Sequence, residues 1–436
     1  MFSLCRLGRM RARSAVLLAA SLLAPIASTA QGADALDVPA AVAAAWQRSQ
    51  ALKATEANAL AARETAVVAG QRPDPVLRLS LDNLPVNGPD RWSTTRDFMT
   101  MRSIGLMQAL PSQRKREARA RRFELEAAAT GELRQWQASE LQRDTTVAWF
   151  ERRAAEQRLV LLDEQLAEAR LQVQAAEAAV RGGKGSPIDW VAARDALWKL
   201  EQDRLKGHAE LVTARNALSR WTGLAPEQPL AEPPTALWRR ETWPALEKAL
   251  DQHPELRALQ GRVEVARAVA AVAREERDPD WGVELMLSQR GSAYSDMLSV
   301  AVSIPLTSNR GRRQDRELAA SLAQADAMEA EWQEAQRSRR QQIATWQQDG
   351  LAALAQRELI DRERLPLARQ RVDLALAAYR SGAAPLSAVL EARQTRLVLA
   401  LERIEMELSV ARPWAALEAL SATKALSMNP PTRGER

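Results

Sequence analysis

Few residues of this sequence carry side chains that could perform chemistry. The 436-residue chain has one cysteine, Cys5, and two histidines, His208 and His253. These are too few and too scattered for a structural zinc site, which takes four ligands. The chain also lacks a phosphate-binding glycine loop, a nucleophile with a plausible base, and paired carboxylates set apart from helix-surface charge. The sequence therefore predicts neither an enzyme nor a bound cofactor.

Methionines are the remaining soft ligands. Five of them, Met99, Met101, Met107, Met286 and Met297, fall in segments that read as strands. Thioether sulfur favours Cu(I), so some of these residues are candidates to contact copper or silver, with Met99, Met101 and Met107 as weak candidate ligands. The competing interpretation is that they are flexible apolar fill facing lipid or neighbouring strands. No metal site is predicted with them.

The N-terminal residues indicate export. Residues 1–13 carry four arginines, an apolar run follows at 15–27, and small residues occupy 28–30. This is typical of a cleaved signal peptide, 1–30. Removal of the signal peptide removes Cys5, and a chain without cysteine suits an oxidising compartment. It also lowers the net charge from +6 to +2. The basic balance is thus largely a targeting feature, and nucleic acid is not expected as a partner.

The sequence contains two copies of one pattern. Three pairs of segments match in the same order in both halves: 74–81 with 280–287, 108–111 with 303–306, and 181–187 with 380–386. Such self-similarity indicates duplication. The expected divisions are the signal peptide 1–30, a first structural repeat 31–221, a proline-rich linker 222–243, a second repeat 244–422, and a flexible tail 423–436.

Each half predicts the same elements in the same order. A first helix (38–71 and 244–277) precedes two short strands, after which a very long helix (112–180 and 307–379) meets a returning helix (187–221 and 386–420). At 1.5 Å per residue each long helix would reach about 100 Å. Turns containing Gly182, Gly183, Gly185 and Gly382 would fold the partners into antiparallel hairpins.

Apolar heptads support these hairpins. The long helix of the first half has apolar residues at alternating spacings of three and four: Leu159, Leu162, Leu166, Ala169, Val173, Ala176 and Val180. Such a seam requires a partner helix at a shallow angle. The returning helices repeat apolar residues in heptad fashion at Val191, Trp198, Leu205 and Val212, and at Leu390, Leu397, Leu401, Ile404 and Leu408. We expect these to face the long helices.

The strands alternate apolar with polar or small residues over 77–81, 281–287 and 298–304, and less regularly over 99–110. Their length suits tilted membrane strands. Four strands cannot close a barrel, and an open edge cannot face lipid. Three subunits would supply twelve strands. The predicted fold is therefore mainly α with a small membrane β-barrel: a trimeric α-helical tunnel topped by a shared 12-stranded barrel.

Charged and aromatic residues flank the strands. Trp92 and Trp281 lie where an interfacial aromatic belt would be expected, although thirteen tryptophans make chance placement a fair alternative. The basic run 114–116 follows the second strand. It suits a solvated helix start better than a membrane boundary, because cations there gain nothing from the helix dipole. His253 precedes Pro254 at a helix entrance and suits a capping residue.

This arrangement, with the tip sequences Val-Arg-Gly-Gly-Lys-Gly-Ser-Pro-Ile-Asp at 180–189 and Tyr-Arg-Ser-Gly-Ala-Ala-Pro-Leu at 379–386, resembles the TolC-like outer-membrane efflux channel family. Segments 82–86 and 96–102 are most similar to its heavy-metal (CzcC and CusC) branch. The resemblance implies a homotrimer in outer-membrane lipid, with a periplasmic helical tunnel. It also implies a periplasmic adaptor and an inner-membrane pump of the resistance–nodulation–division type as partners.

In that family the tunnel closes at its periplasmic tip through bonds between neighbouring hairpins, made by a tyrosine, an arginine and aspartates. Tyr379 matches the tyrosine and Asp189 the aspartate of the facing hairpin. Ala384 stands in the place of the arginine and Ala388 in that of one selectivity aspartate. Glu391 keeps an acidic group one turn further on. The resemblance therefore implies a thinner closing network than usual.

Alternatively, Lys184, Arg181 and Arg380 supply the missing charge, and Tyr379 could also merely cap a helix end. The leading functional interpretation is a passive exit duct for heavy-metal cations. The same channel serving drug or polypeptide export is the first alternative. A soluble periplasmic coiled-coil adaptor is the second, although adaptors usually have one hairpin flanked by β-rich modules.

Overall fold

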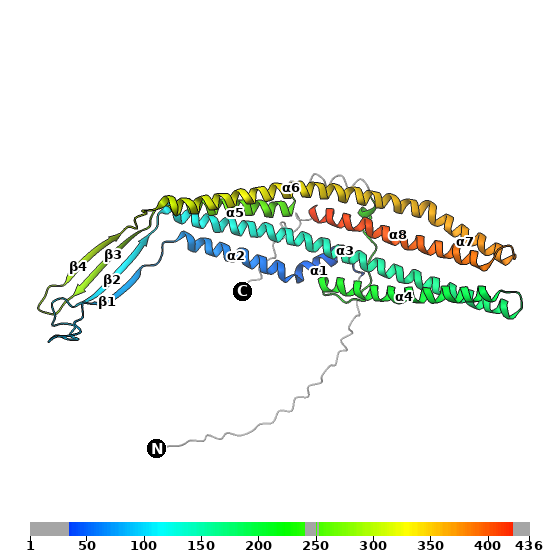
Figure 1. The fold of residues 1–436 in the computed structure, drawn as a ribbon, viewed down its shortest axis with the longest axis horizontal. Helices are drawn as coiled ribbons and strands as arrows, with labels where there is room; N and C mark the ends of the chain where they lie inside the picture. Colours follow the sequence, from blue (N-terminus) through cyan, green and yellow to red (C-terminus); the bar gives the residue numbers. More distant parts are fainter. Residues whose placement is uncertain (1–34, 240–249, 251–252, 422–436) are drawn as a thin grey trace, which may run out of the picture.

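The computed structural model describes residues 35–239, 250 and 253–421. They form a long, gently curved body of helices that continues at one end into a small sheet, while two helical hairpins make the other end (Figure 1). The predicted signal peptide 1–30, the end of the linker and the tail 423–436 lie outside the described residues. No helix in the described ranges is both long enough and apolar enough to cross a bilayer.

The first half follows the predicted order with one break. Its elements are α1 (Val38–Arg48), α2 (Gln50–Gly70), β1 (Val76–Asp82), β2 (Met101–Leu110), α3 (Gln113–Arg181) and α4 (Pro187–Thr222). The predicted single helix 38–71 is wrong at Ser49, whose extended backbone ends α1 and whose hydroxyl accepts from the Leu52 amide to cap α2. Helix α3 is one uninterrupted element of 69 residues.

The second half repeats this order with two differences. Its elements are α5 (Pro254–Glu275), β3 (Trp281–Gln289), β4 (Met297–Ser303), a 3₁₀ turn (Arg310–Arg312), α6 (Gln314–Leu359), the π-helical turn η5 (Ile360–Arg364), α7 (Leu365–Arg380) and α8 (Leu386–Ser421). Helix α5 begins at Pro254 with His253 as its N-cap, and the predicted start at 244 lies outside the described residues. The predicted second long helix is divided at η5, next to Pro366, which has no amide hydrogen to continue the α-helical pattern.

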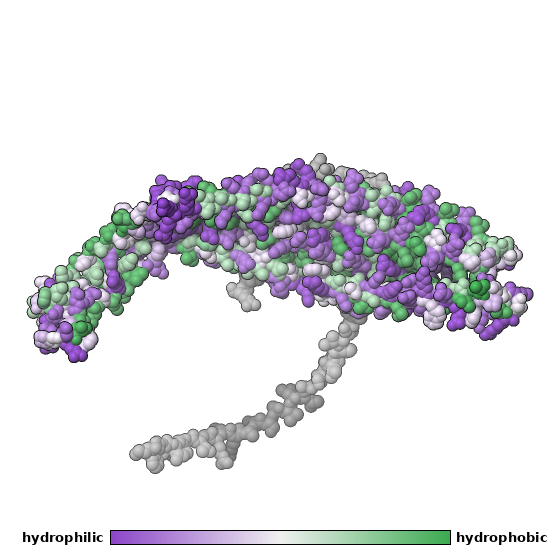
Figure 2. All heavy atoms as spheres, viewed as in Figure 1, coloured by the Kyte–Doolittle hydropathy of each residue, from purple (hydrophilic) through white to green (hydrophobic). Residues whose placement is uncertain are grey.

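The four strands form one antiparallel sheet in the order β1-β2-β3-β4. Strand β2 pairs with β3 across the two halves, with Ile104 opposite Leu287. The two edges, β1 and β4, have no further strand beside them among the described residues. In Figure 2 the sheet carries much of the hydrophobic colour, while the surface of the helical body is largely hydrophilic.

The core lies at the middle of the helical body, where α1, α3, α6 and α8 meet. Trp149 is fully buried, its indole Nε1 donates to the Leu36 carbonyl over 2.8 Å, and its ring packs edge-on against Phe150. The described part of the linker packs here too. Leu36 forms a parallel bridge with Leu230, and Leu237 of the 3₁₀ turn η1 (Thr235–Trp238) is fully buried. The linker thus closes the core.

Candidate functional site

The sheet has one face made almost entirely of large apolar side chains. Strand register places residues from all four strands directly opposite one another in two rows: Leu79, Ile104, Leu287 and Leu298, then Leu77, Leu106, Leu285 and Val300. All eight side chains are between 49% and 71% exposed. Trp281 ends this face on its helical side, and Trp92 lies in the β1–β2 loop. So large an apolar surface is built to meet another apolar medium.

The opposite face is polar. Asp82 accepts hydrogen bonds from the hydroxyls of Ser80 (2.8 Å) and Ser103 (3.2 Å), and Ser103 in turn lies 2.8 Å from the Ser288 hydroxyl. One row further toward the helices, Arg78 forms an ion pair of 3.6 Å with Glu284 across β2. We call this surface the polar face. Its chemistry suits contact with water, so the two faces of the sheet differ sharply.

The methionines of the strands all lie on the polar face. Met101 is opposite Asp82, Met107 is opposite Glu284, Met286 is opposite Gly105, and Met297 is opposite Ser288. The apolar face of the four strands contains no methionine, although it holds leucine, isoleucine, valine and tryptophan. The strand methionines therefore lie apart from the leucine, isoleucine, valine and tryptophan side chains of the apolar face.

Met99, by contrast, precedes β2. It is about half exposed, and its backbone amide donates to the Asp97 carboxylate over 2.8 Å. Among the described residues no group of three or more His, Cys, Asp or Glu side chains is placed to hold a metal ion.

At the far end of the molecule, the two hairpin turns have the same backbone geometry. Gly183 and Gly382 both adopt positive φ, +68° and +76°, which glycine accepts without strain. In the first turn the amides of Lys184 and Gly185 both donate to the Ala179 carbonyl. The second turn repeats this, position for position: the amides of Ala383 and Ala384 donate to Ala378. The flanking Gly182 continues the α3 hydrogen bonds.

The predicted tip residues gather around these turns. Tyr379 is half-buried in a small cluster that joins the two hairpins through Ala176, Ala193 and Leu386. Asp189 lies in the first turn of α4, where a carboxylate is stabilised by the helix dipole. Within one copy the structure places no hydrogen bond between Tyr379 and Asp189, both of which it describes.

The charged tip residues fall into two groups. Arg181 bonds Glu177 one turn earlier over 2.6 Å, and Glu391 accepts from Arg371 of its own hairpin over 2.9 Å. These two charges are already engaged inside single hairpins. Lys184 and Arg380 are instead exposed beside the turns.

The seam of α3 and that of α8 face inward as predicted, but the seam of α4 does not. Leu162, Leu166 and Ala176 of α3 are buried, as are Leu397 and Ile404 of α8. The heptad residues of α4 instead form an exposed row, 45% to 68% accessible, which we call the outer stripe of α4: Val191, Trp198, Leu205 and Val212. Helix α4 packs on α3 through the face that carries Ala193, Gly207 and Leu211.

A second exposed row lies on the other hairpin. Leu359, Leu367 and Leu374 are more than half exposed, and we call them the outer stripe of α6 and α7. Helix α3 contacts both α4 and α8, and α8 contacts α7. The order of these helices side by side is therefore α4, α3, α8, α7 (Figure 1), so the two stripes belong to helices at opposite margins of the row.

The junction between sheet and helices contains Lys115, which the sequence placed in a solvated basic run. Lys115 is 2% exposed, its Nζ donates to the Asp278 carbonyl and the Asp280 carboxylate over 2.7 and 2.6 Å, and Glu276 lies 3.4 Å away. The prediction of a solvated basic run is wrong here. The neighbouring basic residues concealed the burial of Lys115 in the sequence. Only the position of Lys115 relative to the acidic segment 276–280 could have indicated the pairing.

The histidines are structural, and they lie apart. His253 caps α5, accepting the Glu255 amide at Nδ1 over 3.3 Å, as expected for its position before Pro254. Burial lowers the pKa of His253 to about 4, with nearby Arg339 acting in the same direction and Glu255 opposing. His208 is exposed on α4.

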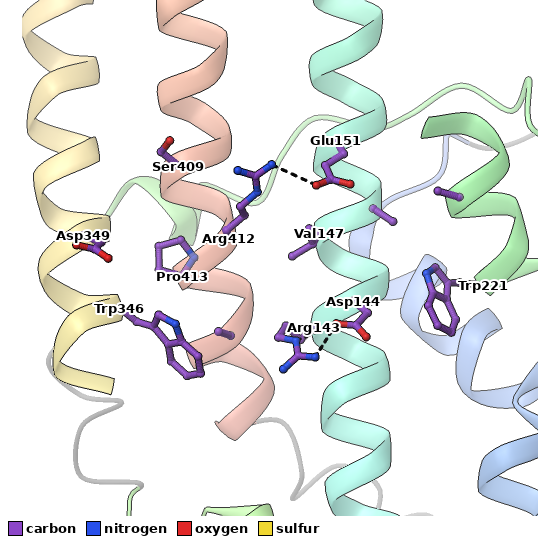
Figure 3. A pocket seen from close by; sticks show the side chains of 13 residues that line it. Arg143, Asp144, Val147, Glu151, Trp221, Trp346, Asp349, Ser409, Arg412 and Pro413 are labelled. Carbon is purple, nitrogen blue, oxygen red and sulfur yellow. Dashed lines mark hydrogen bonds and ion pairs between the residues drawn. The ribbon is translucent and has the colours of Figure 1, made fainter. Parts of the chain in front are cut away.

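A groove of about 720 Å³ lies on the helical body between α3, α4, α6 and α8. Trp221 and Trp346 stand at its two sides, with charged side chains between them (Figure 3). Arg412 is paired with Glu151 over 3.3 Å, and Arg143 with Asp144 over 2.8 Å. These charges neutralise one another, so the groove is a polar surface between packed helices.

Comparisons with known proteins agree with this architecture. Residues 245–423 match the family model described as outer membrane efflux protein. The crystal structure of the outer membrane protein VceC from Vibrio cholerae superposes with a TM-score of 0.71 at 16% identity, covering 88% of this chain and 95% of VceC. CusC, whose structures are described in terms of folding and transmembrane channel formation, superposes with a TM-score of 0.65 at 19% identity, covering 87% and 91%. The fold is thus shared.

One curated relative matches in sequence. The cobalt-zinc-cadmium resistance protein CzcC of Cupriavidus metallidurans is 31% identical over 165 residues, 36% of this chain. The matched region spans 38% of the length of CzcC.

Proposed function

We propose that the chain is a member of the outer membrane efflux protein family, whose model matches residues 245–423, and that it is the outer-membrane channel of a tripartite efflux system, a passive exit duct for heavy-metal cations. Three copies build one pipe, with a barrel in the outer membrane and a helical tunnel in the periplasm. An adaptor and an inner-membrane pump of the resistance–nodulation–division type engage the tunnel. The pump supplies the energy, and the duct supplies the path.

The observation that carries this proposal is the two-faced open sheet. Its apolar face suits lipid and its polar face suits a water-filled lumen. The edges β1 and β4 present unpaired backbone groups, which cost several kcal/mol each in lipid. Because the four strands alternate in direction, β4 of one copy runs antiparallel to β1 of the next. Three copies then close a barrel of twelve strands.

The helices support the same closure. Helix α4 leads away from the hairpin tips, whereas α7 leads toward them. In a ring, the outer stripe of α4 meets the outer stripe of α6 and α7 of the adjacent copy in antiparallel fashion. The outer stripe of α4 repeats every seven residues, as a coiled-coil seam requires, and so do Leu367 and Leu374 of the other stripe. Contact between them removes apolar surface that a single copy leaves in water.

The π-helical turn keeps the leucines of the outer stripe of α6 and α7 in register with the outer stripe of α4. Leu367 and Leu374 are one heptad apart, but Leu359 precedes Leu367 by eight residues. The turn η5 (Ile360–Arg364) lies between them, and a π turn accommodates one additional residue. The three leucines therefore stay on one side of the helix. This irregularity is what a continuous contact with a neighbouring α4 needs.

Cargo passes through by diffusion, and the hairpin tips form the gate. Tyr379 of one copy and Asp189 of its neighbour close the tip through a charge-assisted hydrogen bond. Exposed Lys184 and Arg380 supply the positive charge that Ala384 does not. Arg181 and Glu391 hold their own hairpins together. Docking of the adaptor and pump separates the tips.

Similarity to CzcC, a cobalt-zinc-cadmium resistance protein, supports heavy-metal cations as cargo. Deletion strains test it. We expect lowered tolerance to cobalt, zinc, cadmium, copper or silver, restored by the full chain. Loss of antibiotic tolerance with unchanged metal tolerance would instead indicate drug export. For the channel itself, the purified protein should form trimers that conduct ions in planar bilayers. A stable monomer without conductance would contradict the proposal.

A further inference from the structure

The four strand methionines occupy successive levels of the polar face. Passing from the loop end of the sheet toward the helices, the first row contains Met101 beside Asp82, and the second contains Met297 beside Ser288. The third row contains Met286 beside Gly105. The fourth contains Met107 beside Glu284. Each of these four rows thus has one thioether, and consecutive rows are about 7 Å apart along the strands.

The thioethers are accessible from the polar face. Met107 and Met297 are 39% and 44% exposed, and Met101 and Met286 are half-buried. Glycines leave room beside two of them. Met107 Cε lies 3.8 Å from the point where a Cβ on Gly282 would be, and Met286 Cβ lies 3.5 Å from the equivalent point on Gly105. The sulfurs therefore line a surface and are not enclosed in a packed core.

Their placement has no packing explanation. A side chain chosen only for apolar fill would lie on the apolar face, where the neighbours are leucine and valine. The polar face instead sets these four mainly against serine, aspartate, glutamate and glycine, with Val76 opposite Met107 as an apolar neighbour. A thioether is the one neutral side chain on that face that binds soft monovalent cations while leaving hard cations such as K⁺ in their hydration shells.

We propose that Met101, Met297, Met286 and Met107 form a ladder of weak binding sites for Cu(I) and Ag(I) along the wall of the barrel lumen. This inference rests on the proposed function, because it takes the polar face as the lumen wall. In a trimer each level carries three thioethers. With so few ligands at each level, a cation exchanges readily from one row to the next, as conduction requires.

The test uses the full-length trimer in planar bilayers, in potassium nitrate with silver nitrate as the probe. Wild-type current should fall reversibly with Ag⁺ as the cation occupies the lumen. In a variant with Met101→Leu, Met107→Leu, Met286→Leu and Met297→Leu, which conserves volume, the Ag⁺ concentration for half-reduction should rise about tenfold or more. Its K⁺ conductance should be unchanged.

The matched control replaces two helical methionines, Met328→Leu and Met406→Leu, and should respond to Ag⁺ as wild type does. Equal sensitivity of all three proteins would overturn the ladder. Equilibrium dialysis with Ag⁺ gives a second measure: the strand variant should bind fewer Ag⁺ ions than the helical control, and equal binding would overturn the ladder as well. A wild-type protein without any K⁺ conductance would instead count against the channel, so the two failures are distinguishable.

Discussion

The ammonium of Lys115, three residues into α3, lies 2.6 Å from the carboxylate of Asp280, which directly precedes β3. This pair joins the strand-to-helix junction of the first half to the helix-to-strand junction of the second. Lys115 is buried and also donates to the Asp278 carbonyl. The bond therefore fixes the angle between the sheet and the helical body at the point where they meet.

Replacing Lys115 should loosen this junction. Lys115→Met removes both charge-assisted bonds and leaves Asp280 without its cation, so we expect a loss of about 2–3 kcal/mol of stability. Urea unfolding followed by circular dichroism measures it. Arg114→Met is the matched control, because Arg114 is exposed, and should change stability by less than about 0.5 kcal/mol. Equal effects of the two substitutions would contradict a special role for Lys115.

The contact between outer stripes can be tested by cross-linking. Cys5, in the predicted signal peptide, is the chain's one cysteine. A pair of introduced cysteines is therefore cross-linked without competition from other native cysteines. Trp198→Cys with Leu367→Cys should give covalent trimers with a short bismaleimide, because the proposed ring brings these residues together between copies. Lys199→Cys with Leu367→Cys is the control. Lys199 is at the same height but about 100° around α4, and it should cross-link poorly. The reverse preference would place another surface at the interface.

Opening of the tip should follow loss of the Tyr379 and Asp189 bond. Each such bond contributes about 1.5–3 kcal/mol, and a ring contains three. Tyr379→Phe with Asp189→Ala should therefore raise single-channel conductance in planar bilayers. Tyr294→Phe alters the chain's only other tyrosine, between β3 and β4, and should leave conductance unchanged. If the double variant conducts like wild type, the gate lies elsewhere.

Stability should fall in acid through His253. Its pKa is lowered from 6.5 to about 4 in the folded chain. The unfolded chain therefore binds the extra proton first, and stability declines as pH falls from about 6.5 toward 4, by up to about 3 kcal/mol. His253→Asn keeps a capping acceptor and removes this titration.

The check is the difference in unfolding free energy between wild type and His253→Asn at pH 7 and pH 4. It should shift in favour of the variant at the lower pH. His208→Asn, at an exposed position, serves as the control and should track wild type. A constant difference across this pH range would refute the expectation.

The sequence predicted those elements whose signal is local. Heptads located α3, α4 and α8 to within about two residues, and alternation located β1, β3 and β4. Strand β2 alternated poorly because Gly105 and Met107 occupy its polar face. The break at Ser49 was missed because a capping serine leaves the apolar periodicity on both sides almost intact.

Periodicity could not reveal what each face contacts. Val191, Trp198, Leu205 and Val212 have the spacing of a seam, and that spacing is the same for a partner in the same chain or in another copy. Burial of Lys115 was likewise invisible in a run of basic residues. Alternation within β3 places Met286 on the polar face, but its position opposite Gly105 depends on strand register across the two halves, which no single segment contains.

The additional residue at η5 (Ile360–Arg364) determines how the protein would respond to a change of one residue in length at this point. A chain that gained one further amino acid there, without a second π turn, would turn Leu367 and Leu374 by about 100° relative to Leu359. It would still fold its own hairpin, but its row of exposed leucines would be interrupted between Leu359 and Leu367. An insertion this small would thus leave the single chain folded and weaken the proposed contact with neighbouring copies.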